Sequence, residues 1–129
     1  MTARAAFPLL VAAQAAHSVE EWWFRLWEVL PPARAVSRLL SADLPTGFAI
    51  ANAGIVAFGL WCWLARVRPG RPSARTWMVG WAAVEAANGT GHLLLALLRG
   101  GYFPGAYTAP LLLAAAAAVL AGLRRDAAA

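Results

Sequence analysis

Four long stretches of hydrophobic residues, separated by short polar connectors, dominate this chain. From Thr46 to Ala65 the thiol of Cys62 is the only ionisable side chain, and about 20 apolar residues are enough to cross a bilayer. The other three stretches span residues 5–25, 76–98 and 106–123. The pattern predicts an all-α membrane protein, a four-transmembrane-helix bundle that forms one domain over residues 1–129.

The connectors refine this prediction. Residues 26–45 begin with an apolar turn, continue through Pro31-Pro32, and place Arg34 and Arg38 one helical turn apart. This pattern indicates a short interfacial helix between the first and second membrane helices. The connector 66–75 is a basic turn rich in proline and glycine, and Ser73 is expected to cap the third long helix.

Composition and charge support a membrane location. Hydrophobic residues make up 61% of the chain and charged residues 13%, against roughly 25% charged residues in soluble domains. The net charge of +5 does not indicate nucleic-acid binding, because the arginines sit at helix ends and form no aromatic-interleaved groove. Seven arginines fall on one side of a four-pass arrangement and four on the other, which predicts a plasma-membrane protein with both termini cytoplasmic.

The N-terminal segment has an alternative interpretation as a signal peptide. Arg4 precedes a short apolar stretch, and Ala13-Gln14-Ala15 resembles a small-x-small cleavage site. Pro8 breaks that stretch, and cleavage would leave three membrane helices. We therefore expect the segment to be retained.

The pentapeptide His17-Ser18-Val19-Glu20-Glu21 introduces an imidazole and two carboxylates into an otherwise apolar helix. Helix positions i, i+3 and i+4 share a face, so His17, Glu20 and Glu21 are expected to converge on one small volume. Ionisable groups at bilayer depth are costly, by about 3 kcal/mol or more when unpaired, and such groups mark functional sites.

A second polar group is predicted to lie at the same depth. His17 and Glu20 follow Arg4 by 13 and 16 residues, and the polar residues of the third helix follow Arg75 by 10, 13 and 17. At a rise of 1.5 Å per residue both groups lie roughly 15–25 Å from the inner boundary. Residues 85, 88 and 92 also share a helix face. One site between the first and third helices is therefore expected to include Glu85, Asn88 and His92 as well as the pentapeptide.

Several kinds of chemistry suit this set of residues. Two imidazoles with carboxylates are ligands for a divalent metal such as zinc, iron or manganese. Without a metal, a buried glutamate beside a histidine can act as a general acid and base. A haem held by His17 and His92 is a less favoured cofactor, because glutamates flank both histidines. The same residues can also simply hydrogen-bond one another and fix the packing of the helices.

The chain resembles the HXXEE-domain integral membrane protein family. Three motifs in order carry the resemblance: the pentapeptide 17–21, Asn88-Gly89-Thr90-Gly91-His92, and Tyr102-Phe103-Pro104-Gly105 with Thr108. The resemblance implies a small multi-pass bacterial membrane protein, regarded as a candidate enzyme. It also implies functional roles for His17, Glu20, Glu21, Asn88 and His92.

The sequence thus favours a small membrane enzyme that acts on a lipophilic small molecule entering from the lipid bilayer. The expected metal ligands are His17, Glu20 and His92, and the expected catalytic residues are Glu20, Glu21, Glu85 and Asn88. A metal-free membrane cyclase or isomerase that uses a glutamate as acid and base is the alternative enzyme. A non-catalytic carrier or accessory subunit is the alternative outside enzymes, and a homo-oligomer is left open.

Overall fold

Helices account for nearly all of the computed structural model, which describes residues 1–128. The elements are α1 (Ala3–Trp23), α2 (Leu26–Val29), α3 (Pro31–Leu40), α4 (Leu44–Cys62), the π-helix η1 (Trp63–Val67), α5 (Ala74–Arg99) and α6 (Ala109–Ala128). There is no β-strand within residues 1–128. The all-helical class predicted from the sequence is therefore confirmed.

The helix starts follow local capping chemistry. The Thr2 side chain accepts a hydrogen bond from the Ala5 amide at the start of α1, and Asp43 accepts one from Thr46 at the start of α4. Ser73 precedes α5 as expected, but its side chain makes no capping bond. Between α1 and α2, Arg25 takes a left-handed φ of 56°, which turns the chain sharply into the connector.

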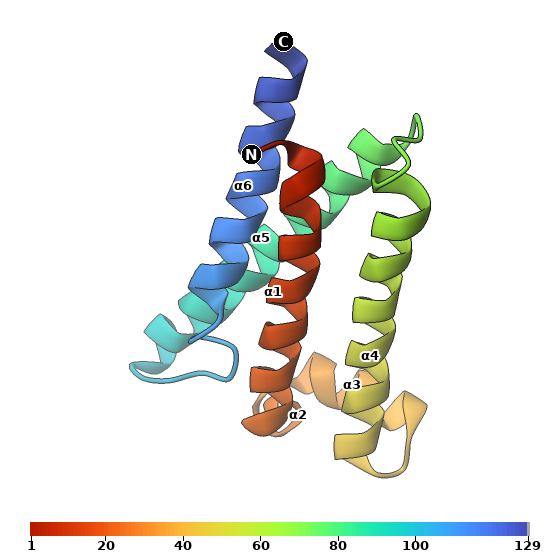
Figure 1. The fold of residues 1–129 in the computed structure, drawn as a ribbon. Helices are drawn as coiled ribbons and strands as arrows, with labels where there is room; N and C mark the ends of the chain where they lie inside the picture. The colour runs from red at the N-terminus through yellow and green to blue at the C-terminus, as the bar shows by residue number, and fades with distance from the viewer. Residues whose placement is uncertain (129) are drawn as a thin grey trace.

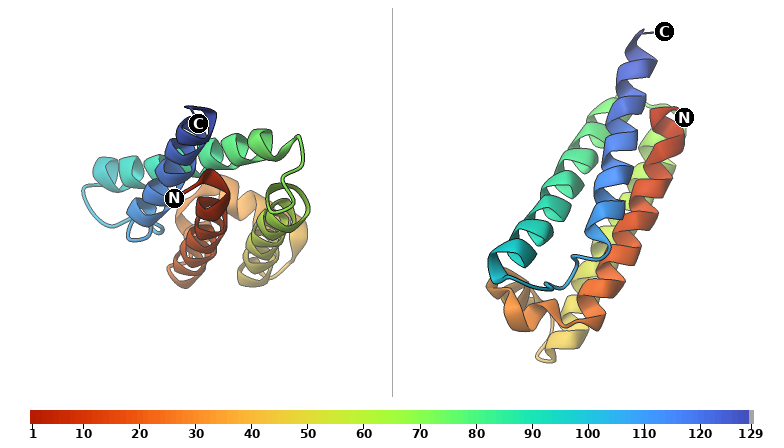
Figure 2. Two further views of the ribbon diagram at one scale, coloured as in Figure 1. Left: turned by 45° about the horizontal axis from the view of Figure 1, so that its top comes forward. Right: turned by 90° about the vertical axis from the view of Figure 1, so that its left-hand side faces the viewer.

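The four long helices α1, α4, α5 and α6 run alternately up and down (Figure 1). Both termini and the turn between α4 and α5 lie at one end, whereas α2, α3 and the loop between α5 and α6 lie at the other. Helix α1 packs against α6 and α4, and α5 packs against α6, as the two further views also show (Figure 2). The connector predicted to contain one short helix contains two, α2 and α3.

Small residues allow the closest helix contact of the main core, where α1 meets α6. Ala3, Ala6 and Leu10 of α1 are fully buried against α6 residues such as Leu112 and Val119. A Cβ at Gly122 would lie 2.4 Å from the Ala3 amide nitrogen, so this contact requires glycine. A second, smaller core joins the connector to the far loop and consists of Leu26, Trp27, Phe48 and Phe103.

Besides its apolar core, this fold buries a set of polar side chains and exposes many large apolar ones. Leu97, Leu98, Val19 and Val84 are 75%, 82%, 63% and 63% exposed. The buried polar side chains on the long helices are Gln14, His17, Ser18, Glu20, Glu21, Asn52, Glu85 and His92. Large exposed apolar side chains on several helices are typical of surfaces that contact a partner or a membrane.

One helical run among residues 1–128, Leu44–Val67, is long and apolar enough by length and composition to cross a membrane. It comprises α4 and η1 and contains 24 residues. Helices α1 and α5 carry the buried polar residues within their length, which lowers their hydropathy. The structure therefore has the four long helices that the sequence predicted, and among residues 1–128 one of them has the composition of a membrane span.

Candidate metal centre and cavity

The pentapeptide lies in the last two turns of α1 and distributes its side chains in two directions. His17 and Glu21, four residues apart, face the bundle interior toward α5. Glu20, one position earlier than Glu21, instead contacts the loop 102–108 that connects α5 to α6. The two adjacent glutamates therefore belong to different parts of the site.

His17, Glu21 and His92 form a compact group with metal-binding geometry. Glu21 Oε1 lies 3.4 Å from His17 Nε2 and 3.1 Å from His92 Nε2. One ligand atom from each of the three residues lies within 4.8 Å of the others, and all three side chains are buried. The two imidazole rings meet edge to face with centroids 4.7 Å apart, which leaves no room for a porphyrin between them.

The outer nitrogen of His17 is fixed by the loop. Its Nδ1 lies 2.7 Å from Thr108 Oγ1, and that hydroxyl lies 2.5 Å from Glu20 Oε2. An ionised carboxylate only accepts hydrogen bonds, so the Thr108 hydroxyl donates its one proton to Glu20. Nδ1 of His17 must then carry the proton that Thr108 accepts, and Nε2 is the nitrogen that faces Glu21.

The two ring nitrogens of His92 have the same roles as those of His17. Its Nδ1 lies 2.5 Å from the Pro104 carbonyl oxygen, which can only accept, so Nδ1 is again the donor. Gly105 follows with a φ of 94°, and a Cβ there would lie 2.5 Å from His92 Nδ1 and 2.8 Å from His17 Cε1. The backbone at this glycine covers both rings, which no larger residue would allow.

Glu20 anchors the loop that covers the two histidines. Its Oε1 accepts hydrogen bonds from the Tyr102 hydroxyl at 2.7 Å and from the amides of Gly105 and Tyr107 at 3.1 and 3.0 Å. Its Oε2 accepts from the Thr108 amide at 2.7 Å as well as from the Thr108 hydroxyl. With five donors, this carboxylate is fully occupied by hydrogen bonds and has no position left for a metal ion.

The group fits a metal ion because both Nε2 atoms and a carboxylate oxygen converge. Histidines that bind metals donate Nδ1–H to an outer acceptor and present Nε2, as both histidines do here. Ligand bonds of about 2.0–2.1 Å in a tetrahedral site separate neighbouring ligand atoms by about 3.3 Å, close to the two distances from Glu21. Within the described chain, His17 Nε2 is also buried without a hydrogen-bond partner.

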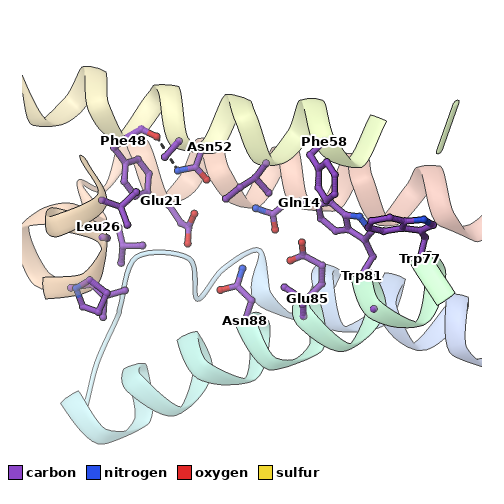
Figure 3. Close-up of a pocket in the computed structure, with 18 residues that line it drawn as sticks. Gln14, Glu21, Leu26, Phe48, Asn52, Phe58, Trp77, Trp81, Glu85 and Asn88 are labelled. Carbon is purple, nitrogen blue, oxygen red and sulfur yellow. Dashed lines mark hydrogen bonds between the residues drawn. The ribbon is translucent and has the colours of Figure 1, made fainter. Parts of the chain in front are cut away.

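A cavity of about 750 Å³ adjoins the group between α4 and α5. Figure 3 shows its polar centre, where Gln14, Glu21, Asn52, Glu85 and Asn88 point inward. One end carries mainly aliphatic side chains, such as Leu26, together with Phe48, and the other is aromatic, with Phe58, Trp77 and Trp81. Ile55, Phe58 and Val84 border the cavity and are 43%, 46% and 63% exposed, so it opens on the side of the bundle.

A chain of hydrogen bonds crosses the cavity floor from α4 to α5. Asn52 Nδ2 donates to the Phe48 carbonyl at 3.1 Å, Ser18 donates to Asn52 Oδ1 at 2.7 Å, and Gln14 Nε2 donates to Ser18 at 3.0 Å. The remaining Gln14 amide atom lies 2.6 Å from Glu85 Oε2 and 3.2 Å from Glu85 Oε1. In this orientation of the amide that atom is oxygen, and Glu85 would have to be protonated to donate to it.

In the opposite amide orientation, the Gln14 nitrogen donates to the Glu85 oxygens at 2.6 and 3.2 Å and the Gln14 oxygen accepts from Ser18. With its nitrogen toward an ionised Glu85, Gln14 would need the single hydroxyl proton of Ser18 for its own oxygen. Asn52 Oδ1 would then lose its donor. One amide orientation therefore requires a protonated Glu85, and the other suits an ionised Glu85.

Aromatic side chains surround the loop on its outer side. Tyr102 and Tyr107 stack with ring centroids 4.4 Å apart, and Phe24 packs edge-on against both. Burial, together with the hydrogen bond to the Glu20 carboxylate, raises the pKa of Tyr102. These rings separate the histidines from the end of the bundle, so the cavity is the more open approach.

The structure brings together most of the residues that the sequence singled out, with one exchange of roles. His17 and His92 are in the metal-binding group as expected, but the third member is Glu21 and the expected ligand Glu20 holds the loop instead. Glu85 and Asn88 line the cavity beside this group. The cause of the exchange is the set of loop donors, which occupy both Glu20 oxygens.

Sequence reasoning missed Gln14 and the role of Ser18. Both lie on the inward face of α1, since residues 14, 17, 18 and 21 are spaced by three and four positions, and this spacing was the available signal. Gly105 was singled out from the sequence only as the last residue of the motif 102–105. The positive φ and the contact with both imidazoles explain why glycine stands there.

Comparison with known proteins places this chain in a family. No curated protein and no solved structure matches it. Residues 8–120 match the family described as "Protein of unknown function with HXXEE motif", so the match includes every residue of the candidate metal centre, the loop 102–108 and nearly the whole bundle. The chain belongs to the HXXEE family.

Proposed function

We propose that this protein is an integral membrane enzyme that binds a divalent metal ion through His17, Glu21 and His92 and acts on a lipophilic molecule. One observation carries the proposal: both imidazoles commit Nδ1 to acceptors in or beside the loop and present Nε2 to Glu21. Glu21 also lines the apolar cavity, so the metal-binding group and the cavity share a residue.

The arrangement of surface residues supports a membrane location. Helices α1, α5 and α6 have 21, 26 and 20 residues, and the run α4–η1 has 24, so each is long enough to cross the hydrocarbon layer. Large apolar side chains cover the outside of the bundle. The arginine-rich turn 66–75 and both termini share one end, which the positive-inside rule assigns to the cytoplasm. In this orientation the cavity opens toward the acyl chains.

The cavity residues have distinct roles in this proposal. A zinc, iron or manganese ion held here would polarise a substrate oxygen or activate a water molecule. Glu85, buried at the edge of the cavity, supplies a proton donor when it is protonated, and Asn88 orients the substrate. The apolar walls exclude bulk water, which strengthens these polar interactions.

A metal-free acid–base enzyme, such as a cyclase or isomerase, is the second candidate. The observation that favours it is the buried Glu85 facing a cavity whose far end carries Phe58, Trp77 and Trp81. A protonated carboxyl group can donate to an alkene or epoxide, and aromatic faces stabilise the positive charge that develops. This candidate does not need Glu21, His17 and His92 to bind a metal.

Elemental analysis of protein purified from membranes separates the two candidates. We expect about one zinc, iron or manganese ion per chain, and loss of it in His17→Ala, His92→Ala and Glu21→Gln. Glu28→Gln is the matched control, because Glu28 is 46% exposed by side chain and pairs with Arg25 away from the site. Metal-free wild-type protein would favour the metal-free enzyme, and the same metal content in Glu21→Gln and Glu28→Gln would contradict the proposed ligand set. Recovery of the chain in the soluble fraction would contradict the membrane assignment.

A further inference from the structure

The cavity has a polar centre between two apolar ends, and this order limits the ligands that it can hold. Phe48 and Phe58 mark the two ends on α4 and are ten residues apart. At 1.5 Å per residue the cavity is about 15 Å long. Asn52 lies between them, opposite Glu21, Glu85 and Asn88 (Figure 3). A matching ligand is therefore elongated, with a polar group between two apolar arms.

The polar centre indicates what that group is. Glu21 and Glu85 offer carboxyl oxygens that accept hydrogen bonds, and the half-buried Asn88 amide offers both a donor and an acceptor. A hydroxyl group can donate to a carboxyl oxygen and accept from the amide at once. A carbonyl group could accept from the Asn88 amide but would leave the carboxyl oxygens without a donor, and a charged group would have a larger desolvation cost between apolar walls.

We propose that the cavity binds a linear or flexible apolar alcohol whose hydroxyl lies between two hydrocarbon arms and is held by Asn88 beside Glu21. This inference rests on the proposed function, because it names the substrate class of the same site. It places the hydroxyl oxygen next to the metal-binding group. The two arms occupy the aliphatic end near Leu26 and Phe48 and the aromatic end near Trp77 and Trp81.

A competition between three probes tests this inference. The probes are linear molecules of about thirteen carbons, close to 15 Å when extended: the hydrocarbon, the alcohol with a terminal hydroxyl, and the alcohol with its hydroxyl on the central carbon. Detergent-purified protein is equilibrated with an equal mixture and re-isolated, and the retained probes are extracted and quantified by gas chromatography. Protein-free micelles give the background partition of each probe.

We expect the central alcohol to be retained about tenfold over the other two, the effect of about one hydrogen bond. Asn88→Leu should reduce this preference to about that of the micelles. Thr90→Leu is the matched control, since Thr90 is exposed on the same helix outside the cavity, and it should keep the preference. Equal retention of the three probes, a preference for the terminal alcohol, or an unchanged preference in Asn88→Leu would overturn the inference.

A second variant tests the cavity without changing its polar groups. Gly80 lines the aromatic end, and a Cβ there would meet no atom within 4 Å, so Gly80→Leu should fold and fill that end. It should lower the retention of all three probes together. Unchanged retention would overturn the inference, because the probes would then be bound elsewhere.

Metal content measured on the same samples distinguishes this inference from the proposed function. Protein that keeps its metal but shows no preference for the central alcohol overturns the inference alone. Protein that prefers the central alcohol but holds no metal overturns the metal-dependent function and leaves the ligand class standing.

Discussion

The loop side and the cavity side of the site treat their polar groups in opposite ways. On the loop side, Glu20 receives five hydrogen bonds from Tyr102, Gly105, Tyr107 and Thr108, and all its acceptor positions are used. On the cavity side, Glu21 and its neighbours face an apolar space that can hold a ligand. The difference indicates that Glu20 holds the loop in place, whereas Glu21 contributes to the metal-binding group and the cavity.

The largest effect is expected from Gly105→Ala, because this substitution changes both the loop side and the cavity side of the site. An alanine would need the left-handed φ, at about 1–2 kcal/mol, and its Cβ would overlap both imidazoles. We expect a loss of stability of about 3 kcal/mol or more and loss of bound metal, measured by thermal unfolding and elemental analysis. Gly101→Ala in the same loop meets no atom within 4 Å and should behave like wild type. Equal behaviour of the two variants would contradict the role of Gly105.

Glu20→Gln should chiefly affect stability. The amide nitrogen of the new glutamine would replace one carboxylate oxygen and would face either the Thr108 N–H or the Gly105 N–H. Two donors would then meet, and each buried donor left without an acceptor lowers the stability by about 1–3 kcal/mol. The matched change Glu21→Gln should leave stability closer to wild type and remove the metal. Thermal unfolding and metal content measured on both variants test this contrast. The comparison between the two sides fails if Glu20→Gln loses metal while keeping its melting temperature.

Thr108→Val tests the connection between the two sides. Valine keeps the shape of threonine but removes the hydroxyl that accepts from His17 and donates to Glu20. Outer partners of metal-binding histidines contribute about 10–100-fold to metal affinity, and we expect a loss in that range. Competition with a chelator provides the measurement, with Thr90→Val as the control on the exposed face of α5. An unchanged affinity would show that the hydroxyl does not orient His17.

The smallest expected effect concerns Tyr102. Its pKa is raised by burial and by the Glu20 carboxylate, so the folded state favours the neutral phenol. The associated stability is fully present below the ordinary tyrosine pKa of about 10 and is lost as the pH rises above it. Tyr102→Phe should cost about 1 kcal/mol near neutral pH and weaken this alkaline loss. Identical pH dependence of unfolding in both proteins would contradict the assignment.

The helices and half of the site could be predicted from local pattern. Apolar stretches located α1, α4, α5 and α6, and counting residues from Arg4 and Arg75 brought His17 and His92 together. Both inferences depend on helix geometry alone, which sequence spacing reports directly. Of the two short helices of the connector, α3 was expected from the sequence, whereas α2 was missed because it is a single turn that follows the left-handed conformation of Arg25.

The roles of Glu20 and Glu21 could not be separated from the sequence. Both fall on the same broad face of α1 as His17, and the choice is made by donors of the loop 102–108, more than eighty residues away in the chain. The cavity could not be predicted from the sequence either, because it depends on how far α4 and α5 diverge around α1. Sequence spacing does not determine that angle.

X-ray absorption at the edge of the bound metal tests the central claim most directly. For wild-type protein we predict two imidazole nitrogens and at least one oxygen as ligands, at about 2.0–2.2 Å. Glu20→Gln should give the same spectrum in the fraction that stays folded, whereas Glu21→Gln should alter the ligand set or yield metal-free protein. A wild-type spectrum without imidazole ligands, or a spectrum changed by Glu20→Gln and not by Glu21→Gln, would contradict the account.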